Sequence, residues 1–301
     1  MITVFGSINM DLIANTPRLP KPGETLAGTG FSTAAGGKGA NQALAATRAG
    51  ARVAMVGAVG GDAFAEGALA LMREAGTDLA GVRRVGAPTG TAHILVGGDG
   101  ENVIIVVASA NGLVDAADAE RAVAALTPSD TIMLQLEVPA EAVEAALSAA
   151  RRAGVRSIIN IAPLTPEAAR LGRLADIVIA NETEFELLAG RQDLDAASRR
   201  AAMQALHDET GRTVIVTLGA DGAIAIHEGD VITAAGLAIE PVDTVGAGDT
   251  FCGYLAAGLD AGLDFAQALR RAAVAGSLAC LKPGAQPAIP LSADVDAALQ
   301  G

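Results

Sequence analysis

The stretch "VAMVGAVGGDAFAEGALALMREA", residues 53–75, decides the fold class. Its first part, Val53–Val59, is an unbroken run of apolar residues and glycine with the length of a buried strand. Its second part, Ala63–Ala75, carries alanine, leucine and methionine at helical spacing. A strand that is apolar on both faces and is followed at once by a helix is typical of a parallel sheet covered by helices.

The same pair of elements recurs along the chain. Further strands are predicted at Thr131–Leu136, Val155–Ile161, Ile177–Ile179 and Thr213–Leu218, and further helices at Gly39–Ala49, Ala140–Ala153, Ala196–Thr210 and Ala247–Gly262. The alternation predicts an α/β fold, a doubly wound, mostly parallel sheet with helices on both faces. In such sheets ligands bind at the carboxyl ends of the strands.

Two segments interrupt the alternation. "HILVGGDGENVIIVV" (93–107) consists of two strand-like runs around a Gly-Gly-Asp-Gly turn, which favours a hairpin. Residues 10–33 are rich in Thr, Pro and Gly and lack helical periodicity. Together, residues of about 10–33 and 90–110 would form a small β-sheet, a lid on the α/β body. A surface hairpin and a loop fit the pattern equally well.

Composition limits the classes of function. The 301 residues are 51% hydrophobic and 18% charged, which suits a single large α/β domain with an appendage. The net charge of −13 and the absence of Trp argue against nucleic acid and anionic lipid as partners. No uncharged apolar run reaches the roughly 18 residues that span a bilayer. Two distant cysteines, Cys252 and Cys280, favour a reducing compartment, so a cytoplasmic protein is expected.

A glycine-rich turn, "DTVGAGDTF" (243–251), leads into the last of the predicted helices. Backbone N–H groups at such a helix start bind anions, so the turn from Gly246 to Asp249 is a candidate anion hole. Asp249 beside it is placed to take a proton from an attacking hydroxyl. A structural role, an acidic residue favoured by the helix dipole, is the alternative.

A second glycine-rich turn, "AAGGKGAN" (34–41), precedes another helix, and no Ser or Thr follows Lys38 as a P-loop requires. The chain also has no dinucleotide-binding G-x-G-x-x-G after its first strand. "GSINMD" (6–11) is predicted to end the first strand, which would place Asn9 and Asp11 on one face. Asn9, Asp11 and Asn41 suit the hydroxyls of a polyol, because carboxylates accept and amides both donate and accept. Taken singly, each is better explained by turn chemistry. The three histidines, His93, His207 and His227, share no metal-binding spacing.

Seven motifs, in order and over nearly the whole chain, resemble those of the ribokinase-like (PfkB) carbohydrate kinases. They are "GSINMD", "GGKGANQA", "LQLEVP", "NETE", "TLGADG", "DTVGAGDTF" and "PGAQPAIP", running from Gly6 to Pro290. Among them, "GSINMD", "GGKGANQA" and "GAQP" resemble most the motifs of the branch that phosphorylates ribose. The resemblance implies the fold derived above, with a small β-sheet lid that often makes a dimer contact.

The resemblance also implies roles for individual residues. The sugar would be bound by Asn9, Asp11, Gly37, Lys38, Asn41 and Glu137, with Asp249 as the base that activates its 5-hydroxyl and Gly246, Ala247 and Gly248 as the anion hole. ATP would lie against Thr217, Gly219, Gly222 and Gly248, with Asn181 near its phosphates. Glu184 would organise Mg²⁺ through water. A K⁺ held by Asp243 and the carbonyls of Val245, Ala279, Lys282 and Gly284 would shape the anion hole from a distance.

The expectation is therefore an ATP-dependent, Mg²⁺-requiring and K⁺-activated kinase acting on D-ribose, a homodimer through the lid. A sister kinase for 2-deoxyribose, fructose or a nucleoside is the nearest alternative. A non-catalytic sugar- or nucleotide-binding protein is another. Such a protein would most simply lack the base or the Mg²⁺ residue, and both Asp249 and Glu184 are present.

Overall fold

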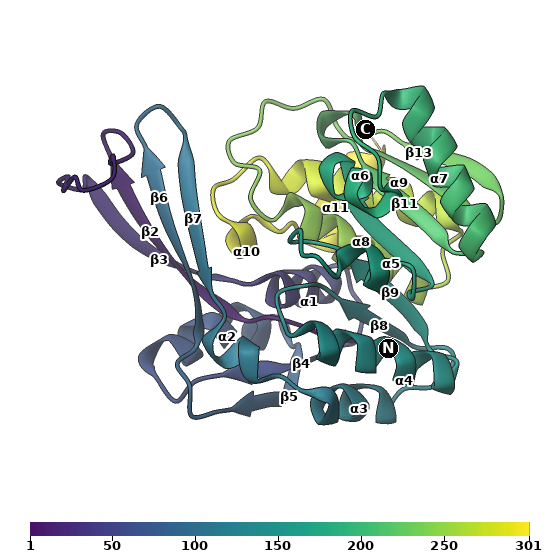
Figure 1. The fold of residues 1–301 in the computed structure, drawn as a ribbon, viewed down its shortest axis with the longest axis horizontal. Helices are drawn as coiled ribbons and strands as arrows, with labels where there is room; N and C mark the ends of the chain where they lie inside the picture. Colours follow the sequence, from purple (N-terminus) through teal and green to yellow (C-terminus); the bar gives the residue numbers. More distant parts are fainter. Residues whose placement is uncertain (301) are drawn as a thin grey trace.

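A nine-stranded sheet forms the centre of the protein in the computed structural model, which describes residues 1–300. In spatial order its strands are β13 (Asp230–Ala234), β12 (Ala223–His227), β11 (Thr213–Thr217), β10 (Ile177–Asn181), β9 (Arg156–Asn160), β8 (Thr131–Leu134), β1 (Ile2–Phe5), β4 (Val53–Val59) and β5 (Asp78–Arg84). All neighbours from β11 to β5 pair in parallel, whereas β12 pairs antiparallel with both β11 and β13 (Figure 1). The predicted, mostly parallel sheet is confirmed.

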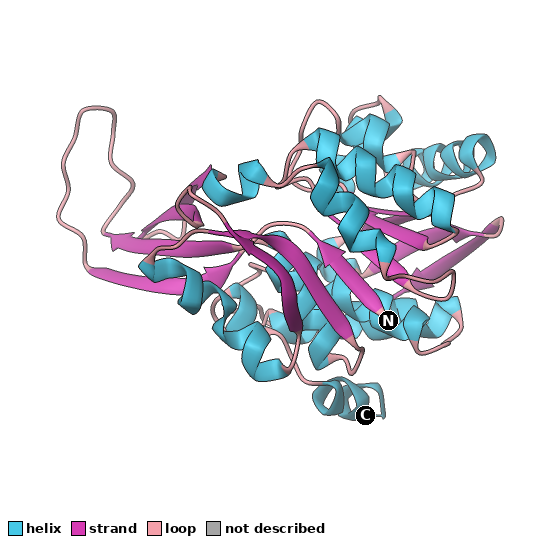
Figure 2. Cartoon of the chain, turned by 90° about the horizontal axis from the view of Figure 1, so that it is seen from below, coloured by secondary structure: helices cyan, strands magenta, loops and turns pink. Residues whose placement is uncertain are grey.

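Helices cover both faces of this sheet (Figure 2). One core contains residues of α1 (Lys38–Arg48), α2 (Ala63–Ala75), α8 (Ala247–Asp260), α9 (Phe265–Ala279) and α11 (Ser292–Gln300). The other contains residues of α3 (Ala116–Ala124), α4 (Ala140–Ala153), α5 (Ala168–Gly172), α6 (Glu182–Ala189) and α7 (Ala196–Thr210). Short elements complete the fold: α10 (Ala285–Ala288), η1 (Ser109–Leu113) and η2 (Gly219–Asp221).

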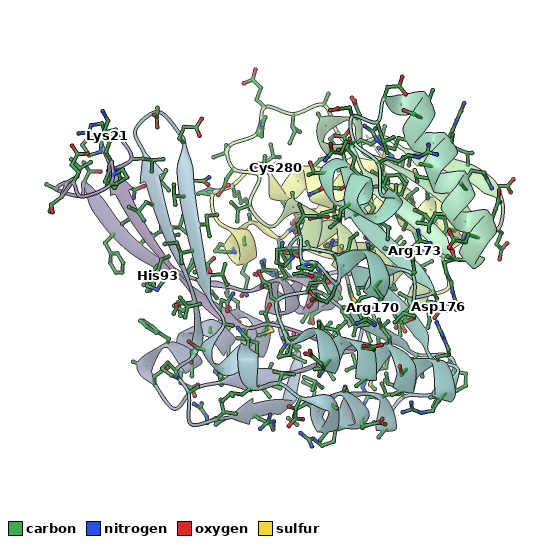
Figure 3. All side chains as sticks on the ribbon, viewed as in Figure 1. Lys21, His93, Arg170, Arg173, Asp176 and Cys280 are labelled. Carbon is green, nitrogen blue, oxygen red and sulfur yellow. The ribbon has the colours of Figure 1, made fainter. Side chains whose placement is uncertain are left out.

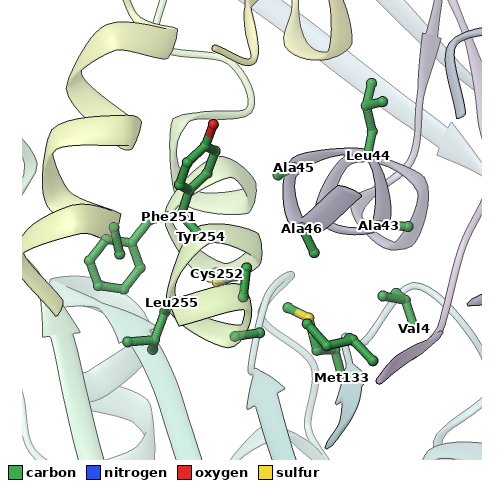
Figure 4. Close-up of a cluster of buried hydrophobic side chains, with 14 of the residues drawn as sticks. Val4, Ala43, Leu44, Ala45, Ala46, Met133, Phe251, Cys252, Tyr254 and Leu255 are labelled. Atoms are coloured by element: carbon green, nitrogen blue, oxygen red, sulfur yellow. The ribbon is translucent and has the colours of Figure 1, made fainter. Parts of the chain in front are cut away.

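The strands are apolar throughout because successive side chains enter different cores. In β8, Met133 packs in the core of α1 and α8, while Ile132 and Leu134 pack in the core of α3 and α4. Figure 4 shows the first of these cores, with Val4 and Met133 from the sheet beneath the side chains of α1 and α8. This alternation is the period-two pattern of a sheet buried on both sides.

A second, four-stranded sheet projects from the body (Figure 1). Its order is β3 (Gly30–Gly36), β2 (Asn9–Thr16), β6 (Gly90–Gly97) and β7 (Asn102–Val107), and β6 and β7 form the predicted hairpin. Lys21, in the connection from β2 to β3, lies at the end of this sheet that is far from the body (Figure 3). The small sheet thus exists as a separate layer, rather than as an isolated surface hairpin.

The predicted course of the first strand was wrong. "GSINMD" does not end that strand: β1 ends at Phe5, and β2 begins at Asn9 and belongs to the small sheet. The chain changes sheets between Phe5 and Asn9, beside the start of α1, where the Ala40 N–H donates to the Ser7 carbonyl. Asn9 and Asp11 nevertheless share one face of a strand, as expected. Within residues 1–300, no helix has both the length and the apolar character to cross a membrane.

Candidate active site

The glycine-rich turn before α8 places a helix N-terminus at the surface of a pocket. Gly246 has φ of 78°, and a Cβ there would lie 2.9 Å from the Cα of Ala285, so both conformation and space favour glycine. The helix begins at Ala247 as predicted, and Gly248 is exposed, with nothing within 4 Å of the place of a Cβ. The first N–H groups of a helix have no partner inside it, so they are available to an anion.

Asp249, in the first turn of α8, is only 6% exposed and accepts two side-chain hydrogen bonds. Asn41 Nδ2 donates to its Oδ2 at 2.9 Å, and Gln42 Nε2 donates to its Oδ1 at 3.0 Å. Both donors come from α1, which packs closely on α8 because Gly253 brings the backbones together. A Cβ at Gly253 would lie 2.7 Å from the Gln42 carbonyl oxygen. The carboxylate is thus buried with its orientation fixed.

Two further predicted carboxylates, those of Glu137 and Asp11, lie near Asp249. Glu137 accepts from the hydroxyl of Ser7 at 2.6 Å and from the backbone N–H of Lys38 at 3.0 Å. The carboxylate of Asp11 lies over Gly36, where a Cβ would come within 2.4 Å of its oxygens. Burial, together with the charges of Glu137 and Asp249, raises the pKa of Asp11 to about 7. The dominant cause of this high pKa is therefore the loss of water around the carboxylate.

Asn9, also predicted, is held by a residue that the motif analysis did not assign. Asn111 in η1 donates from Nδ2 to Asn9 Oδ1 at 2.7 Å. Its other contacts are with the backbone of Ile8, which donates to Asn111 Oδ1 at 2.9 Å. A Cβ at Gly90 would lie 2.2 Å from the Asn111 amide nitrogen, so the small sheet approaches closely here. Asn111 therefore joins η1 to Asn9 at the start of β2 and to Ile8 just before it.

A pocket of about 200 Å³ connects Asp249 to the residues expected at the phosphates. Its lining comprises Lys38, Asn160, Ala162, Ile179, Asn181, Glu184, Thr217, Thr244, Gly246, Gly248, Asp249 and Cys252. Burial would lower the pKa of Lys38, but the carboxylates of Asp249, Glu137 and Glu184 together raise it above its ordinary value. Lys38 is therefore a buried ammonium among carboxylates, at the carboxyl ends of β9, β10 and β11.

Asn181 and Glu184 also have a structural role, which explains their order in the sequence. The Glu184 N–H donates to Asn181 Oδ1 at 2.8 Å, and the Asn181 N–H donates to Glu184 Oε2 at 2.8 Å. This reciprocal pair is a capping box that starts α6. Burial raises the pKa of Glu184, against the lowering effects of the Asn181 N–H and of Lys38. The capping box fixes a buried carboxylate at the pocket wall.

Of the three glycines expected at the nucleotide, Gly248 lines the pocket, whereas Gly219 at the start of η2 and Gly222 just after it do not. Gly222 has φ of 87°, and a Cβ there would lie 2.1 Å from the carbonyl oxygen of Ala234. Gly219 has φ of 57° and is exposed. They shape the loop that follows Thr217 at the end of β11, and Thr217 itself reaches the pocket.

The residues expected around K⁺ come from two loops that lie side by side. Asp243 Oδ1 accepts from the Val245 N–H at 3.0 Å, and Oδ2 accepts from the Gly284 N–H at 2.8 Å. The Asp243 N–H in turn approaches the Cys280 carbonyl at 3.3 Å, just after Ala279 ends α9. Lys282 lies on the exposed part of the second loop. The Asp243 carboxylate thus holds the two loops together.

Comparison with known proteins shows the family to which the chain belongs. Residues 1–291 match the family described as pfkB family carbohydrate kinase. The chain belongs to this family. It is 37% identical to the ribokinase of Haemophilus influenzae over 290 residues, covering 96% of this chain and 95% of the relative. It is also 33% identical over 291 residues to the deoxyribokinase of Salmonella typhimurium, with 96% and 95% covered.

Solved structures agree with the family. The pfkB-family chain superimposes with a TM-score of 0.89 on Arabidopsis thaliana ribokinase complexed with ribose and ATP, which is 33% identical. That comparison covers 100% of this chain and 98% of the plant protein. A ribokinase from Thermotoga maritima gives a TM-score of 0.88 at 28% identity, covering 100% and 99%. The protein is thus an ATP-dependent carbohydrate kinase by family and by fold.

Three buried polar residues of this pfkB-family site were not predicted from the sequence: Ser7, Gln42 and Asn111. Each contacts a residue that was predicted, namely Glu137, Asp249 and Asn9. Ser7 and Gln42 lie inside quoted motifs, which was the available signal. Asn111 is separated from Asn9 by 102 positions, and nothing local in the sequence links the two.

Proposed function

We propose that the protein transfers the terminal phosphoryl group of ATP to the 5-hydroxyl of D-ribose, with Asp249 as the general base. The observation that carries this proposal is the fixed position of Asp249 at the start of α8. It lies between a pocket that contains Lys38 and Glu184 and the polar side chains of the predicted sugar site. The similarity to a ribokinase complexed with ribose and ATP supports the choice of both substrates.

The roles follow from the chemistry of each group. Asn9, Asp11 and Glu137, with Gly37 and Lys38, would bind the sugar hydroxyls and bring one of them to Asp249. Asp249 would accept the proton as the hydroxyl attacks phosphorus. Gly246, Ala247 and Gly248 would neutralise the charge on the transferring group through their N–H groups. Positioning and electrostatics supply most of the catalysis of phosphoryl transfer, so this set of groups is sufficient.

The nucleotide and the ions would occupy the neighbouring positions. ATP would lie along Thr217, Gly219, Gly222 and Gly248, and Asn181 would approach its phosphates. Glu184 would hold Mg²⁺ through water, and the ion would supply charge neutralisation on the phosphates. K⁺ would be bound by Asp243 and the carbonyls of Val245, Ala279, Lys282 and Gly284, on two loops that the Asp243 carboxylate joins.

The small sheet would serve as a lid on the sugar and as a dimer contact. Residues Val103–Val107 of β7 are each 43–58% exposed, and Phe31 of β3 is 70% exposed. A row of apolar residues on an edge strand is a site for pairing with another sheet, and a second copy of the chain would cover it.

The two cysteines are free thiols, which supports a cytoplasmic location.

The test is a coupled assay of ADP release with ATP and Mg²⁺ on ribose, 2-deoxyribose, fructose and adenosine, each with and without K⁺. Ribose-dependent turnover that K⁺ stimulates is expected. A preference for 2-deoxyribose would keep the fold and the base but change the acceptor, and the similarity to a deoxyribokinase makes that acceptor the second candidate. Turnover of none of them, with ATP still bound, would favour a binding protein.

A further inference from the structure

Two buried glutamines form a chain of hydrogen bonds that ends on Asp249. Gln135, which directly follows β8, donates from Nε2 to Gln42 Oε1 at 2.7 Å. Gln42 donates from Nε2 to Asp249 Oδ1 at 3.0 Å. Both glutamine side chains are shielded from water, at 0% and 1% exposed. The motif resemblance gave no role to either residue.

The direction of this chain is fixed by its surroundings. Gln42 Nε2 also approaches Asn160 Oδ1 at 3.3 Å, and Asn160 Nδ2 donates to the backbone carbonyl of Ile179 at 3.3 Å. That carbonyl can only accept, so Asn160 must direct its oxygen toward Gln42. With its amide reversed, Gln42 would face both Asn160 Oδ1 and a carboxylate with an oxygen. Its N–H groups must therefore face Asp249.

The surrounding backbone leaves room for these side chains at three glycines. A Cβ at Gly6 would lie 2.0 Å from Gln135 Oε1, so glycine is needed where β1 ends. Gly39 lets the start of α1 approach Gly6 and Ser7 to within 2.7 Å of the place of its Cβ. Gly253, one turn after Asp249, does the same between α1 and α8. The close approach of three elements sets the distance from Gln42 to Asp249.

We propose that Gln42, held by Gln135, is a positioning residue that fixes the carboxylate plane of Asp249 for proton transfer. The terminal torsion of an aspartate is broad rather than confined to staggered wells, so rotamer preference alone does not orient its oxygens. Asn41 holds Oδ2 and Gln42 holds Oδ1, and loss of either contact frees the carboxylate to rotate. Two neutral amides supply no proton, so their effect is on geometry. This inference rests on the proposed role of Asp249 as the base.

The first test is Gln42→Met, which keeps an unbranched side chain of similar length but removes the donor. Misplacing a reacting group by about 1 Å costs on the order of 10²-fold in rate, so kcat is expected to fall about 10- to 100-fold. The dissociation constant for ribose, measured by calorimetry, and KM for ATP should stay within about threefold. Gln204→Met on the surface helix α7 is the matched control and should leave kcat unchanged.

The second test is a double-mutant cycle with Gln135→Met. Gln135 reaches Asp249 only through Gln42, so this variant should lower kcat by a smaller factor, about 3- to 10-fold. The double variant should be no slower than Gln42→Met alone, since Gln135 has no further partner to act on in that background. Simple multiplication of the two effects would contradict the chain and indicate two independent contributions.

The outcomes separate this inference from the proposed function. If Asp249→Asn abolishes turnover while folded Gln42→Met keeps kcat within about twofold, the positioning role is wrong and the base stands. If Asp249→Asn keeps its activity, the proposed base is wrong, and the inference falls with it. A loss of ribose affinity in Gln42→Met without a change in kcat would also overturn the inference. Should that variant not fold, Gln42→Leu replaces it, because it also removes the donor to Asp249 without adding a charge.

Discussion

Asn41 Nδ2 lies 2.9 Å from Asp249 Oδ2, although 208 positions separate the two residues in the chain. One belongs to α1, which follows β3 in the chain, and the other lies in the first turn of α8, beside the proposed anion hole. A residue assigned to the sugar is thus in direct contact with the residue assigned to proton transfer. This contact links binding to chemistry, and it shapes what substitutions at either end should do.

Asp249→Asn should lower kcat by at least about 10²-fold, which is the scale of general-base catalysis. The asparagine keeps the size of the side chain but does not accept the proton of the attacking hydroxyl. Ribose binding should persist, because the other polar residues of the sugar site are unchanged. Steady-state turnover with calorimetry on the same sample measures both quantities, and turnover near that of the parent would rule out Asp249 as the base.

Asn41→Ala should weaken ribose affinity far more than ATP affinity. The amide is 6% exposed, and its removal takes away one donor to Asp249 and one contact proposed for the sugar. kcat should fall as well, since Asp249 Oδ2 loses its partner. Separate titrations of ribose and of ATP distinguish the two affinities. Equal losses for both substrates would indicate misfolding instead.

Much of the fold was predictable because buried elements carry strong periodic signals. The predictions for β4, α2, α4 and α7 match the observed bounds, and β8, β9, β10, β11, α1 and α8 differ at their ends by one or two residues. β5 was not predicted, because this edge strand is partly exposed and its sequence "DLAGVRR" has no apolar run. The antiparallel strands β12 and β13 were missed as well, and β13 is similarly exposed. Helices α3, α5, α6, α9, α10 and α11 were also missing from the prediction.

The site was predictable only as far as its motifs carry named chemistry. Asp249 and Asn41 were proposed because a carboxylate beside a glycine turn and an amide at a helix start suit recognised roles. Gln42 and Asn111 instead donate to Asp249 and Asn9, and these partners lie 207 and 102 positions away. Such pairings depend on how elements pack in space, so local sequence gives no sign of them.

Ribose binding should weaken as the pH falls from about 8 to about 6, because the pKa of Asp11 is about 7. The ionised carboxylate accepts hydrogen bonds from sugar hydroxyls, and protonation removes that capacity. Calorimetric dissociation constants across this range test the expectation. Asp11→Asn should bind ribose more weakly at pH 8 and with little dependence on pH. An unchanged pH dependence in that variant would assign the titration to another group.

The same pKa predicts how stability without ligand depends on pH. The folded-state pKa of Asp11, about 7, lies above its ordinary value of 3.8, so the folded protein binds more protons than the unfolded chain between those values. This contribution to stability is present at low pH and is lost as the pH rises toward 7. Asp11→Asn, which carries no charge, should therefore melt at a higher temperature than the parent at pH 8. A melting temperature of Asp11→Asn below that of the parent at pH 8 would contradict a destabilising buried charge at Asp11.

Gly253→Ala should impair both stability and turnover. The new Cβ would lie 2.5 Å from the Ala45 Cβ and 2.7 Å from the Ala46 nitrogen, so α1 and α8 must separate. Overpacking of this kind costs about 1–3 kcal/mol, and the shift would draw Asp249 away from both of its donors. Gly67→Ala in α2 is the control, since its Cβ would meet only the flexible end of Met10. Denaturant unfolding and kcat should both be affected at Gly253 and hardly at Gly67.

The exposed edge of the small sheet gives the last prediction, which concerns assembly. Ile105 in β7 is 58% exposed within a run of apolar residues, and a charge there would oppose pairing with a second copy. Ile105→Asp should convert the proposed dimer to a monomer in sedimentation experiments. Val231, on the edge strand β13 of the central sheet, is 46% exposed. Val231→Asp is therefore the matched control and should leave the mass unchanged. If the parent is itself a monomer at micromolar concentrations, or if Ile105→Asp stays dimeric, the small sheet is not the interface. If the sheet also closes over the sugar, the monomeric variant should bind ribose more weakly while Asp249 chemistry, read as kcat at saturating ribose, changes little.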